Sequence, residues 1–312
     1  MKQKIVIAGG SGFLGRVLAK YFTAKGWAVV ILTRRPDPGC PQGREVYWDG
    51  CTLGDWAKEL EGADALINLA GVSVDCRYTE RNRRLIMDSR IDSTRVLGEA
   101  MARCQQAPQV WINSSTATIY KHTYGVPWDE EGEIGATAEA KDAFSIEVAT
   151  AWERVFNEAK VPGTRKVALR TAMVLGHGRN SVFPVMRRMI RFGLGGQMGD
   201  GRQYMSWIHE VDFCRAIEWL IAREDVSGVV NLAAPKPVTN AEMMRTFREV
   251  CGMPFGLPAT KWMLEIGAVL LRTETELIIK SRRVVPGRLL REGFQFRFSE
   301  VRGALVDLMG TA

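Results

Sequence analysis

Glycines at three-residue spacing follow the first apolar run of the chain. Gly9, Gly12 and Gly15 form one pattern, and Gly10 begins a second pattern that overlaps it. Between a strand and a helix, such glycines let the backbone approach a diphosphate without a Cβ clash, while the helix N-terminus offers amide donors. The turn predicts a dinucleotide site with these contacts: Gly9, Gly10, Ser11, Gly12, Phe13, Leu14 and Gly15.

Two arginines end the second apolar run, where the adenosine ribose of a dinucleotide would lie. NAD-binding chains place an acidic residue about 20 residues beyond the glycines, where it bonds the ribose 2′-hydroxyl. This sequence has Thr33, Arg34 and Arg35 there. Two guanidinium groups suit a 2′-phosphate, so the predicted cofactor is NADP(H), contacted by these three residues. Solvated loop arginines are the alternative, because Asp37 follows closely.

Short apolar runs alternate with helix-like stretches along most of the chain. Predicted strands cover residues 4–8, 28–32, 45–48, 65–69, 110–113, 166–170 and 229–232. Predicted helices cover residues 13–25, 52–60, 80–103, 142–159 and 211–222. Strands that alternate with helices predict an α/β fold, a doubly wound Rossmann parallel sheet covered on both faces.

The sequence changes character after the last predicted strand. Helix-like stretches at 242–251 and 262–271 precede an aromatic run at 294–298. We predict two domains, an NADP-binding Rossmann domain over residues 1–235 and a smaller C-terminal substrate lobe over residues 236–312. The lobe is expected to pack on the Rossmann domain over a ligand cleft.

The composition narrows the class of protein. Of 312 residues, 46% are hydrophobic and 25% are charged, as in soluble globular proteins. Because no apolar run approaches the ~20 residues that cross a bilayer, we expect a cytoplasmic protein without a membrane partner. The six cysteines form no CxxC pair, so no metal site is predicted. The net charge of +7 comes from dispersed residues, which argues against nucleic acid and suits anionic small molecules.

Two further runs follow predicted strands and resemble a known family. Asn68-Leu69-Ala70-Gly71 comes after the fourth strand, and Ser114-Ser115-Thr116-Ala117-Thr118-Ile119-Tyr120 comes after the fifth. On these runs the chain resembles the extended short-chain dehydrogenase/reductases of the NAD-dependent epimerase/dehydratase superfamily. Nearly the whole chain resembles an atypical, poorly characterised epimerase-like family that carries its own C-terminal extension. The motifs behind this closer resemblance are Ser89-Arg90-Ile91, Trp152-Glu153, Leu169-Arg170-Thr171, Val174-Leu175-Gly176, Gly193-Leu194-Gly195-Gly196, Gly201-Arg202-Gln203, Ser206-Trp207-Ile208-His209, Asn231 with Pro235, and Gly293-Phe294.

The resemblance implies roles for individual residues. It places the diphosphate near the glycine turn, the adenosine phosphate near Thr33 and Arg34, and the adenine ribose or nicotinamide near Leu69 and Ala70. It also implies four more side chains around the cofactor: Arg90, Ser114, Arg170 and Val174. A site after the fourth strand is sensible, because ligands of open α/β sheets bind at the carboxyl ends of strands. For Arg90, a solvated side chain or a structural ion pair stays open.

The usual catalytic dyad of the superfamily is absent. Typical members use a serine or threonine with Tyr-x-x-x-Lys, in which the lysine lowers the pKa of the tyrosine so that the phenol passes a proton. Counting back from Trp152-Glu153 places the tyrosine position near Phe144-Ser145 and the lysine position near Val148-Ala149. A Tyr-x-x-x-Lys match does occur, Tyr21 with Lys25, but it falls on the first helix and is interpreted as a chance match.

Hydroxyl groups and one histidine are the remaining catalytic candidates. Ser115 and Thr116 stand at the serine position that the resemblance implies, and His209 lies in a later loop. A hydroxyl can polarise a carbonyl group, and a neutral histidine can supply a proton. We therefore predict catalytic roles for Ser115, Thr116 and His209. The alternatives are hydroxyls that hold the loop backbone and a histidine that caps a strand and bonds Asp212.

Two functions stay open at this point. The first is an NADP(H)-dependent oxidoreductase or epimerase acting on an unidentified small molecule, anionic if Arg77, Arg170 and Arg202 face it. Polar groups that converge beside the nicotinamide favour this function. The second is a non-enzymatic NADP(H)-sensing regulatory protein, for which the resemblance implies a link to cell division. The missing dyad favours the second, and the sequence leaves a homodimer open.

Overall fold

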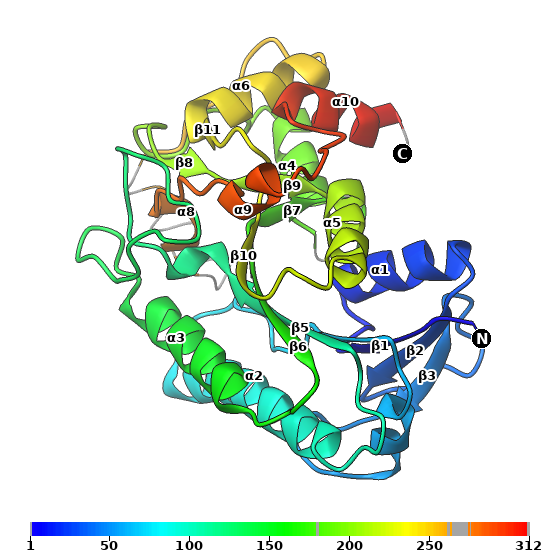
Figure 1. The fold of residues 1–312 in the computed structure, drawn as a ribbon. Coiled ribbons are helices and arrows are strands. Elements are labelled where there is room, and N and C mark those ends of the chain that lie inside the picture. The colour runs from blue at the N-terminus through cyan, green and yellow to red at the C-terminus, as the bar shows by residue number, and fades with distance from the viewer. Residues whose placement is uncertain (1, 179–180, 261–262, 264–273, 275, 311–312) are drawn as a thin grey trace.

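The computed structural model describes residues 2–178, 181–260, 263, 274 and 276–310. Its base is one seven-stranded parallel sheet in the order β10-β6-β5-β4-β1-β2-β3 (Figure 1). The strands are β1 (Lys4–Ala8), β2 (Ala28–Thr33), β3 (Arg44–Tyr47), β4 (Ala65–Asn68), β5 (Val110–Thr116), β6 (Arg165–Thr171) and β10 (Gly228–Leu232). Nearly continuous apolar runs in the central strands suit a sheet that is buried on both faces.

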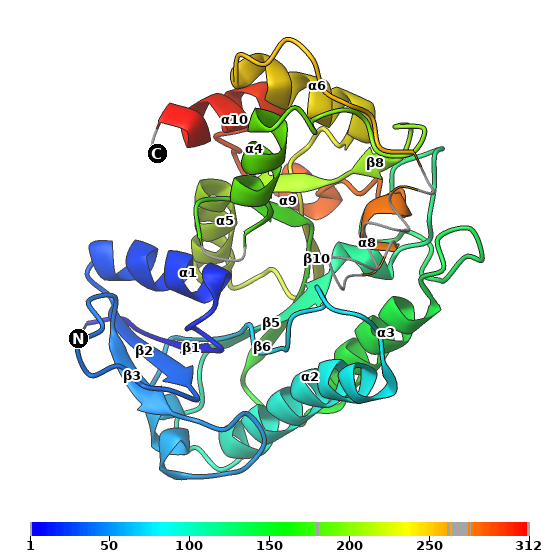
Figure 2. The ribbon, with the colours of Figure 1, turned by 180° about the vertical axis from the view of Figure 1, so that it is seen from behind.

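Helices cover both faces of this sheet. The helices α1 (Phe13–Ala24) and α5 (Glu210–Ala222) pack together on one face, and α2 (Glu80–Met101) and α3 (Ala143–Glu158) pack together on the other (Figures 1 and 2). Each face encloses its own apolar core. Two 3-10 helices, η1 (Asp55–Leu60) and η2 (Ala117–Ile119), follow β3 and β5. The doubly wound Rossmann fold is therefore confirmed.

A smaller layer of helices and short strands lies away from β1, β2 and β3 (Figure 2). It contains α4 (Val182–Arg191), α6 (Asn240–Val250) and α10 (Val301–Gly310), with β7 (Met173–Leu175) paired to β9 (Trp207–His209) and β8 (Tyr204–Met205) paired to β11 (Val238–Thr239). Its core joins Phe183 and Trp207 to Phe247 and Leu305. This core therefore contains residues from before and after residue 235, where the sequence places the boundary between two domains. The domain boundary stays a prediction.

The C-terminal tail returns to the Rossmann layer. The short helix α8 (Glu276–Ile279) precedes α9 (Gly287–Arg291), which packs on β10, and Phe294 enters the apolar core beneath α5. The predicted helix at 262–271 lies outside the described residues. The sequence did not predict α4, because Pro184 interrupts its pattern, yet proline is tolerated in the first turn of a helix.

Candidate functional site

The glycine turn joins β1 to α1 at the carboxyl edge of the sheet. Gly9 has φ +73°, and a Cβ built on it would lie 2.8 Å from the Cα of Ala70. A Cβ on Gly15 would lie 2.3 Å from the Cα of Gly10. These close contacts are within the chain, so the fold itself requires Gly9 and Gly15.

Gly12 differs from the other glycines of the turn. It is the N-cap of α1, and a Cβ there would have one neighbour within 4 Å, the carbonyl oxygen of Gly9 at 3.6 Å. Nothing in the described chain therefore demands glycine at this position. An open space in front of a helix N-terminus is what a bound diphosphate needs. The predicted role of Gly12 agrees with this geometry.

The residues after β2 present cationic groups to solvent. Arg34 and Arg35 are both exposed, and no described acidic side chain forms an ion pair with either. Thr33 is buried, and its hydroxyl donates to the hydroxyl of Ser11 at 3.0 Å. This bond ties the end of β2 to the glycine turn, so the two arginines extend from the turn that would hold the diphosphate.

A cavity of about 210 Å³ opens where β4 and β5 end. Six residues predicted from the sequence line it: Leu69, Ala70, Arg90, Ser114, Ser115 and Thr116. The residue before Leu69, Asn68, shapes this turn, because its side-chain oxygen accepts from the backbone amide of Ala70 at 3.0 Å. Since Ala70 also contacts Gly9, the cavity adjoins the glycine turn. The structure thus brings most of the predicted cofactor contacts to one place.

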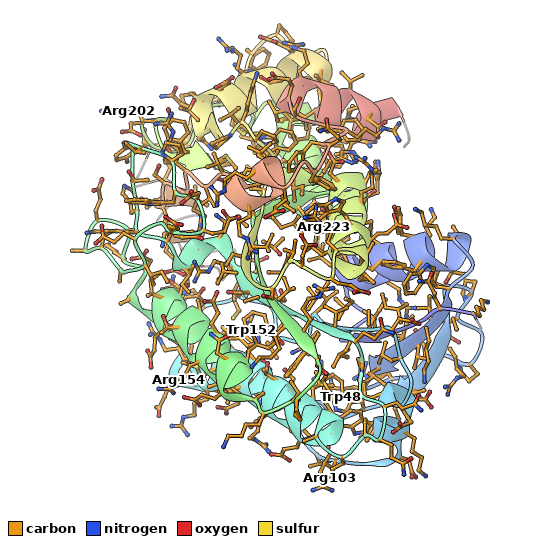
Figure 3. The ribbon with its side chains drawn as sticks, viewed as in Figure 1. Trp48, Arg103, Trp152, Arg154, Arg202 and Arg223 are labelled. Carbon is orange, nitrogen blue, oxygen red and sulfur yellow. The ribbon has the colours of Figure 1, made fainter. Side chains whose placement is uncertain are left out.

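Arg90 lies in the wall of this cavity without a carboxylate partner among the described residues. Its Nη1 donates to the carbonyl oxygens of Ile86 at 2.9 Å and Val72 at 3.1 Å, and its guanidinium lies 5.2 Å from the ring centre of Trp152. Burial lowers the pKa of Arg90 to about 10. Figure 3 shows Trp152 pointing inward from α3, whereas Arg154 points outward. Arg90 is therefore neither a solvated side chain nor part of a described ion pair.

Ser115 belongs to a buried polar network. Its hydroxyl donates to Glu153 Oε1 at 2.6 Å, and Arg170 forms a bidentate ion pair with Glu153, with both distances 2.8 Å. Arg170 also donates to the Tyr120 hydroxyl at 2.9 Å, which in turn donates to Asn231 at 2.8 Å. Burial raises the pKa of Tyr120 to about 12. The only proton of the Ser115 hydroxyl is thus committed to a carboxylate that Arg170 already neutralises.

The hydrogen bonds of this network argue against the cofactor contact that was expected for Arg170. This side chain is 4% exposed and does not line the cavity. Its guanidinium donates its hydrogen bonds to Glu153 and Tyr120 instead. Val174, the other predicted cofactor contact in this part of the chain, lies in β7 within the core beneath the sheet. Thr116 accepts from the backbone amide of Thr118 at 3.1 Å. The geometry therefore favours structural roles for Arg170 and Val174, and a backbone-holding role for the Thr116 hydroxyl.

His209 lies outside the cavity. Its Nδ1 accepts from the backbone amide of Val211 at 3.1 Å and so caps α5, and its ring lies 4.0 Å from the ring of Phe298. The residue is 1% exposed, and burial lowers its pKa to about 4. The side chain caps a helix rather than a strand, and Asp212 bonds backbone amides of the tail instead of the histidine. The catalytic role predicted for His209 has no support in this geometry.

The positions to which the sequence analysis assigns the tyrosine and lysine of the dyad face the cavity. Phe144, Ser145, Val148 and Ala149 all line it. The chance match on α1 lies elsewhere: the hydroxyl of Tyr21 and the ammonium of Lys25 both bind Glu218 of α5. Neither Tyr21 nor Lys25 lines the cavity, which agrees with their interpretation as a chance match.

Several residues beside the cavity were not predicted from the sequence. Glu276 accepts hydrogen bonds from Tyr78 and from Ser145, two residues that line the cavity. Lys280, 1% exposed, pairs with Asp142 and donates to the carbonyl oxygen of Thr118 at 2.6 Å. The tail therefore supplies charged groups to the cavity wall. These contacts span more than one hundred residues of sequence, so no local pattern signals them.

The described part of the chain also bears on metal binding and on membrane-spanning helices. No cluster of histidine, cysteine, aspartate or glutamate could hold a metal ion there. None of the described helices combines the length and the apolar character that crossing a bilayer requires.

Comparisons with known proteins agree with this geometry. Residues 5–233 match the NAD dependent epimerase/dehydratase family, and residues 259–308 match a domain of unknown function, DUF1731. The human epimerase family protein SDR39U1 is 30% identical over 98% of this chain and 100% of its own length, and YfhF of Bacillus subtilis is 30% identical over 98% of both chains.

Solved structures show the same similarity. The crystal structure of human SDR39U1 with NADPH has a TM-score of 0.87, with 28% identity over 99% of this chain and 100% of that one. A nucleoside-diphosphate sugar epimerase from Corynebacterium glutamicum has a TM-score of 0.77 and 27% identity, covering all of this chain and 59% of that one. The chain therefore belongs to the NAD dependent epimerase/dehydratase family.

Proposed function

We propose that this protein is an NADP(H)-dependent oxidoreductase that acts on a small molecule. The glycine turn would hold the diphosphate, with Gly12 facing it, and Arg34 and Arg35 would bind the 2′-phosphate. Leu69, Ala70, Arg90 and Ser114 would surround the nicotinamide. When bound, NADP(H) would supply or accept a hydride. The presence of NADPH in the crystals of human SDR39U1 supports this choice of cofactor.

The cavity is the main support for an enzymatic function. It adjoins the glycine turn, and its walls combine apolar side chains with hydroxyl groups on β5, η2 and α3. A concave, largely apolar space with a few converging polar groups is the usual form of a small-molecule site. A protein that only sensed the dinucleotide would not need the part of this space that lies beyond the nicotinamide, toward Phe144 and Ser145.

The charges around the cavity narrow the substrate class. An anionic substrate was expected from three arginines, but Arg170 is paired with Glu153 and Arg77 lies 3.7 Å from Glu274. Arg202 is exposed, and its guanidinium lies over the ring of Tyr124 at the periphery (Figure 3). Neither Arg77 nor Arg202 lines the cavity. Arg90 is the one charged side chain among the described residues of the cavity wall, so an anionic group of a substrate would bind there and not at Arg77, Arg170 or Arg202.

Two observations favour the regulatory alternative. Phe144, Ser145, Val148 and Ala149 replace the tyrosine and lysine of the dyad, and the Ser115 proton is committed to Glu153. Without another proton carrier, the protein would bind NADP(H) and leave substrates unchanged. The two functions therefore differ in whether bound NADPH turns over.

A combined binding and turnover experiment separates these functions. NADPH binding is measured by fluorescence, and NADPH oxidation is then followed with a panel of aldehydes, ketones and nucleotide sugars. Tight binding with turnover of a panel member supports the oxidoreductase. Tight binding without turnover of any member supports the regulatory function, and absence of NADPH binding refutes both.

A further inference from the structure

A carboxylate from the C-terminal tail stands directly behind the cavity wall. Glu276 is 5% exposed and does not itself line the cavity. Its Oε1 accepts from the hydroxyl of Ser145 and, at 3.0 Å, from the hydroxyl of Tyr78. Both donors are residues of the cavity wall. A buried acid is thus connected to the cavity through two hydroxyl groups.

Glu276 differs from Glu153, the other buried acid that holds a serine of the wall. Arg170 neutralises Glu153 through two hydrogen bonds. Glu276 accepts hydrogen bonds from two neutral hydroxyls and forms no described ion pair, although its charge also acts on the nearby cations Lys280 and Arg282. Glu276 is therefore the buried acid that is connected to the cavity through hydroxyl groups and has no bidentate arginine on its carboxylate.

The two hydroxyls of this cluster offer lone pairs to a ligand. Each has donated its single proton to Glu276, so toward the cavity each can only accept a hydrogen bond. A bound ligand must therefore donate to them, as an alcohol does. Apolar side chains such as Ile86, Phe144 and Val148 line the same cavity and suit an apolar body.

Ser145 also stands where the dyad would place its tyrosine. Counting along α3 assigns that position to Phe144-Ser145, and of this pair only Ser145 carries a hydroxyl. Ser145 is therefore both at the position of the missing phenol and connected to a buried acid. A hydroxyl backed by a carboxylate can pass a proton where a phenol backed by a lysine otherwise would.

We propose that Ser145 binds the reacting hydroxyl of a small alcohol with an apolar body and passes its proton to Glu276. The redox part of this inference rests on the proposed function. As the alcohol becomes a carbonyl compound, its O–H proton moves to Ser145 Oγ and the Ser145 proton moves to Glu276. The hydrogen of the C–H bond leaves with both bonding electrons as the hydride that NADP⁺ accepts. Carbonyl reduction runs the same transfers in reverse.

Tyr78 acts as a positioning residue in this cluster. Burial raises the pKa of its phenol, which therefore keeps its proton and donates it to Glu276. Its backbone amide donates to Glu274 at 2.7 Å, and its ring packs edge-on against Phe144. These contacts fix the phenol beside Glu276, and the phenol helps to keep the carboxylate oriented toward Ser145.

The test compares matched probes that differ in one hydroxyl group. Binding of benzyl alcohol and toluene, and of cyclohexanol and methylcyclohexane, is measured by NMR titration of the full chain saturated with NADPH. A hydrogen bond to a group held by a carboxylate should make each alcohol bind about tenfold more tightly than its hydrocarbon partner. Ser145→Ala and Glu276→Gln should reduce this preference to about onefold.

Two further variants separate this role from a general effect on folding. Ser145→Thr keeps the hydroxyl and should restore the preference for the alcohol. Glu147→Gln removes an exposed charge of α3 that does not bond Ser145, and it should leave the preference unchanged. Thermal melting of each variant verifies that the chain is folded, and an NADPH titration verifies that the dinucleotide site is intact.

The outcomes distinguish this inference from the proposed function. Absence of NADPH binding in the unmodified protein refutes the proposed function. If NADPH binds but neither alcohol is preferred, or if the preference survives both Ser145→Ala and Glu276→Gln, the assignment of Ser145 and Glu276 is wrong. A preference that disappears in Ser145→Ala and returns in Ser145→Thr supports it.

Discussion

Replacing Gly12 with valine should abolish dinucleotide binding and leave the protein folded. The Cβ has one neighbour within 4 Å, at 3.6 Å, and the backbone angles of Gly12, φ −74° and ψ 175°, are extended ones that valine readily adopts. The energetic cost to folding is that of a poorer N-cap, about 1 kcal/mol. This cost should lower the melting temperature by only about 2–4 °C.

The cost to binding is much larger. The side chain would occupy the space in front of the α1 N-terminus, where the backbone amides should bond the diphosphate. Loss of two charge-assisted hydrogen bonds, at about 1.5–3 kcal/mol each, weakens binding more than a hundredfold. Fluorescence titration with NADPH measures the affinity, and thermal melting measures the stability.

Gly15→Ala is the matched control for this prediction. Its Cβ would lie 2.3 Å from the Cα of Gly10, so it should disturb the turn itself and lower stability by about 1–3 kcal/mol or more. The two variants should therefore differ in melting while both lose NADPH. Wild-type affinity in Gly12→Val would show that the turn does not hold a dinucleotide, and unfolding of that variant would refute the analysis of its surroundings.

Two further predictions concern buried charges. Glu153→Gln leaves the buried guanidinium of Arg170 without its carboxylate and should lower the free energy of unfolding, measured with urea, by about 3–5 kcal/mol. The double change to leucine at Glu153 and Arg170 should recover most of this loss. A loss below about 1 kcal/mol in Glu153→Gln would contradict the role of the pair. His209 has a folded-state pKa of about 4 against 6.5 in the unfolded chain, so the unfolded state binds more protons between these values and stability is lost as the pH falls from about 6.5 to 4. His209→Asn keeps an acceptor for the Val211 amide and removes the titrating group. Between pH 6.5 and 4, its free energy of unfolding in urea should therefore fall by about 3 kcal/mol less than that of the unmodified protein. An equal decrease in both proteins would exclude this histidine as the cause.

The sequence alone was sufficient to predict the parallel sheet and the glycine turn. Both depend on local signals, since apolar runs of strand length mark β1, β2 and β4, and the glycine spacing is required by close backbone contacts at Gly9 and Gly15. The predicted strands and helices of the Rossmann layer therefore agree with the structure to within a few residues. Strands of two or three residues, such as β8 and β11, are too short to show a period.

The candidate site was only partly predictable for a different reason. Its cofactor side follows local motifs, whereas its polar chemistry depends on which distant side chains meet. Arg170 has a plausible position for a cofactor contact, but its hydrogen bonds go to Glu153 on another element, which the sequence does not signal. Ser145 has no distinguishing neighbours in the sequence, and Glu276 lies 131 residues away from it. Tertiary contacts of this kind have no signal in one sequence.

Comparison of NADPH with NADH binding tests the central claim most directly. Arg34 and Arg35 are exposed and have no described carboxylate partner, so a 2′-phosphate should gain about 1.5–3 kcal/mol from them. Fluorescence titration should therefore give tighter binding of NADPH by about tenfold to over a hundredfold, and the double variant Arg34→Ala/Arg35→Ala should bind both dinucleotides with similar affinity. Equal affinities in the unmodified protein, or a preference that persists in the double variant, would contradict the account of this site.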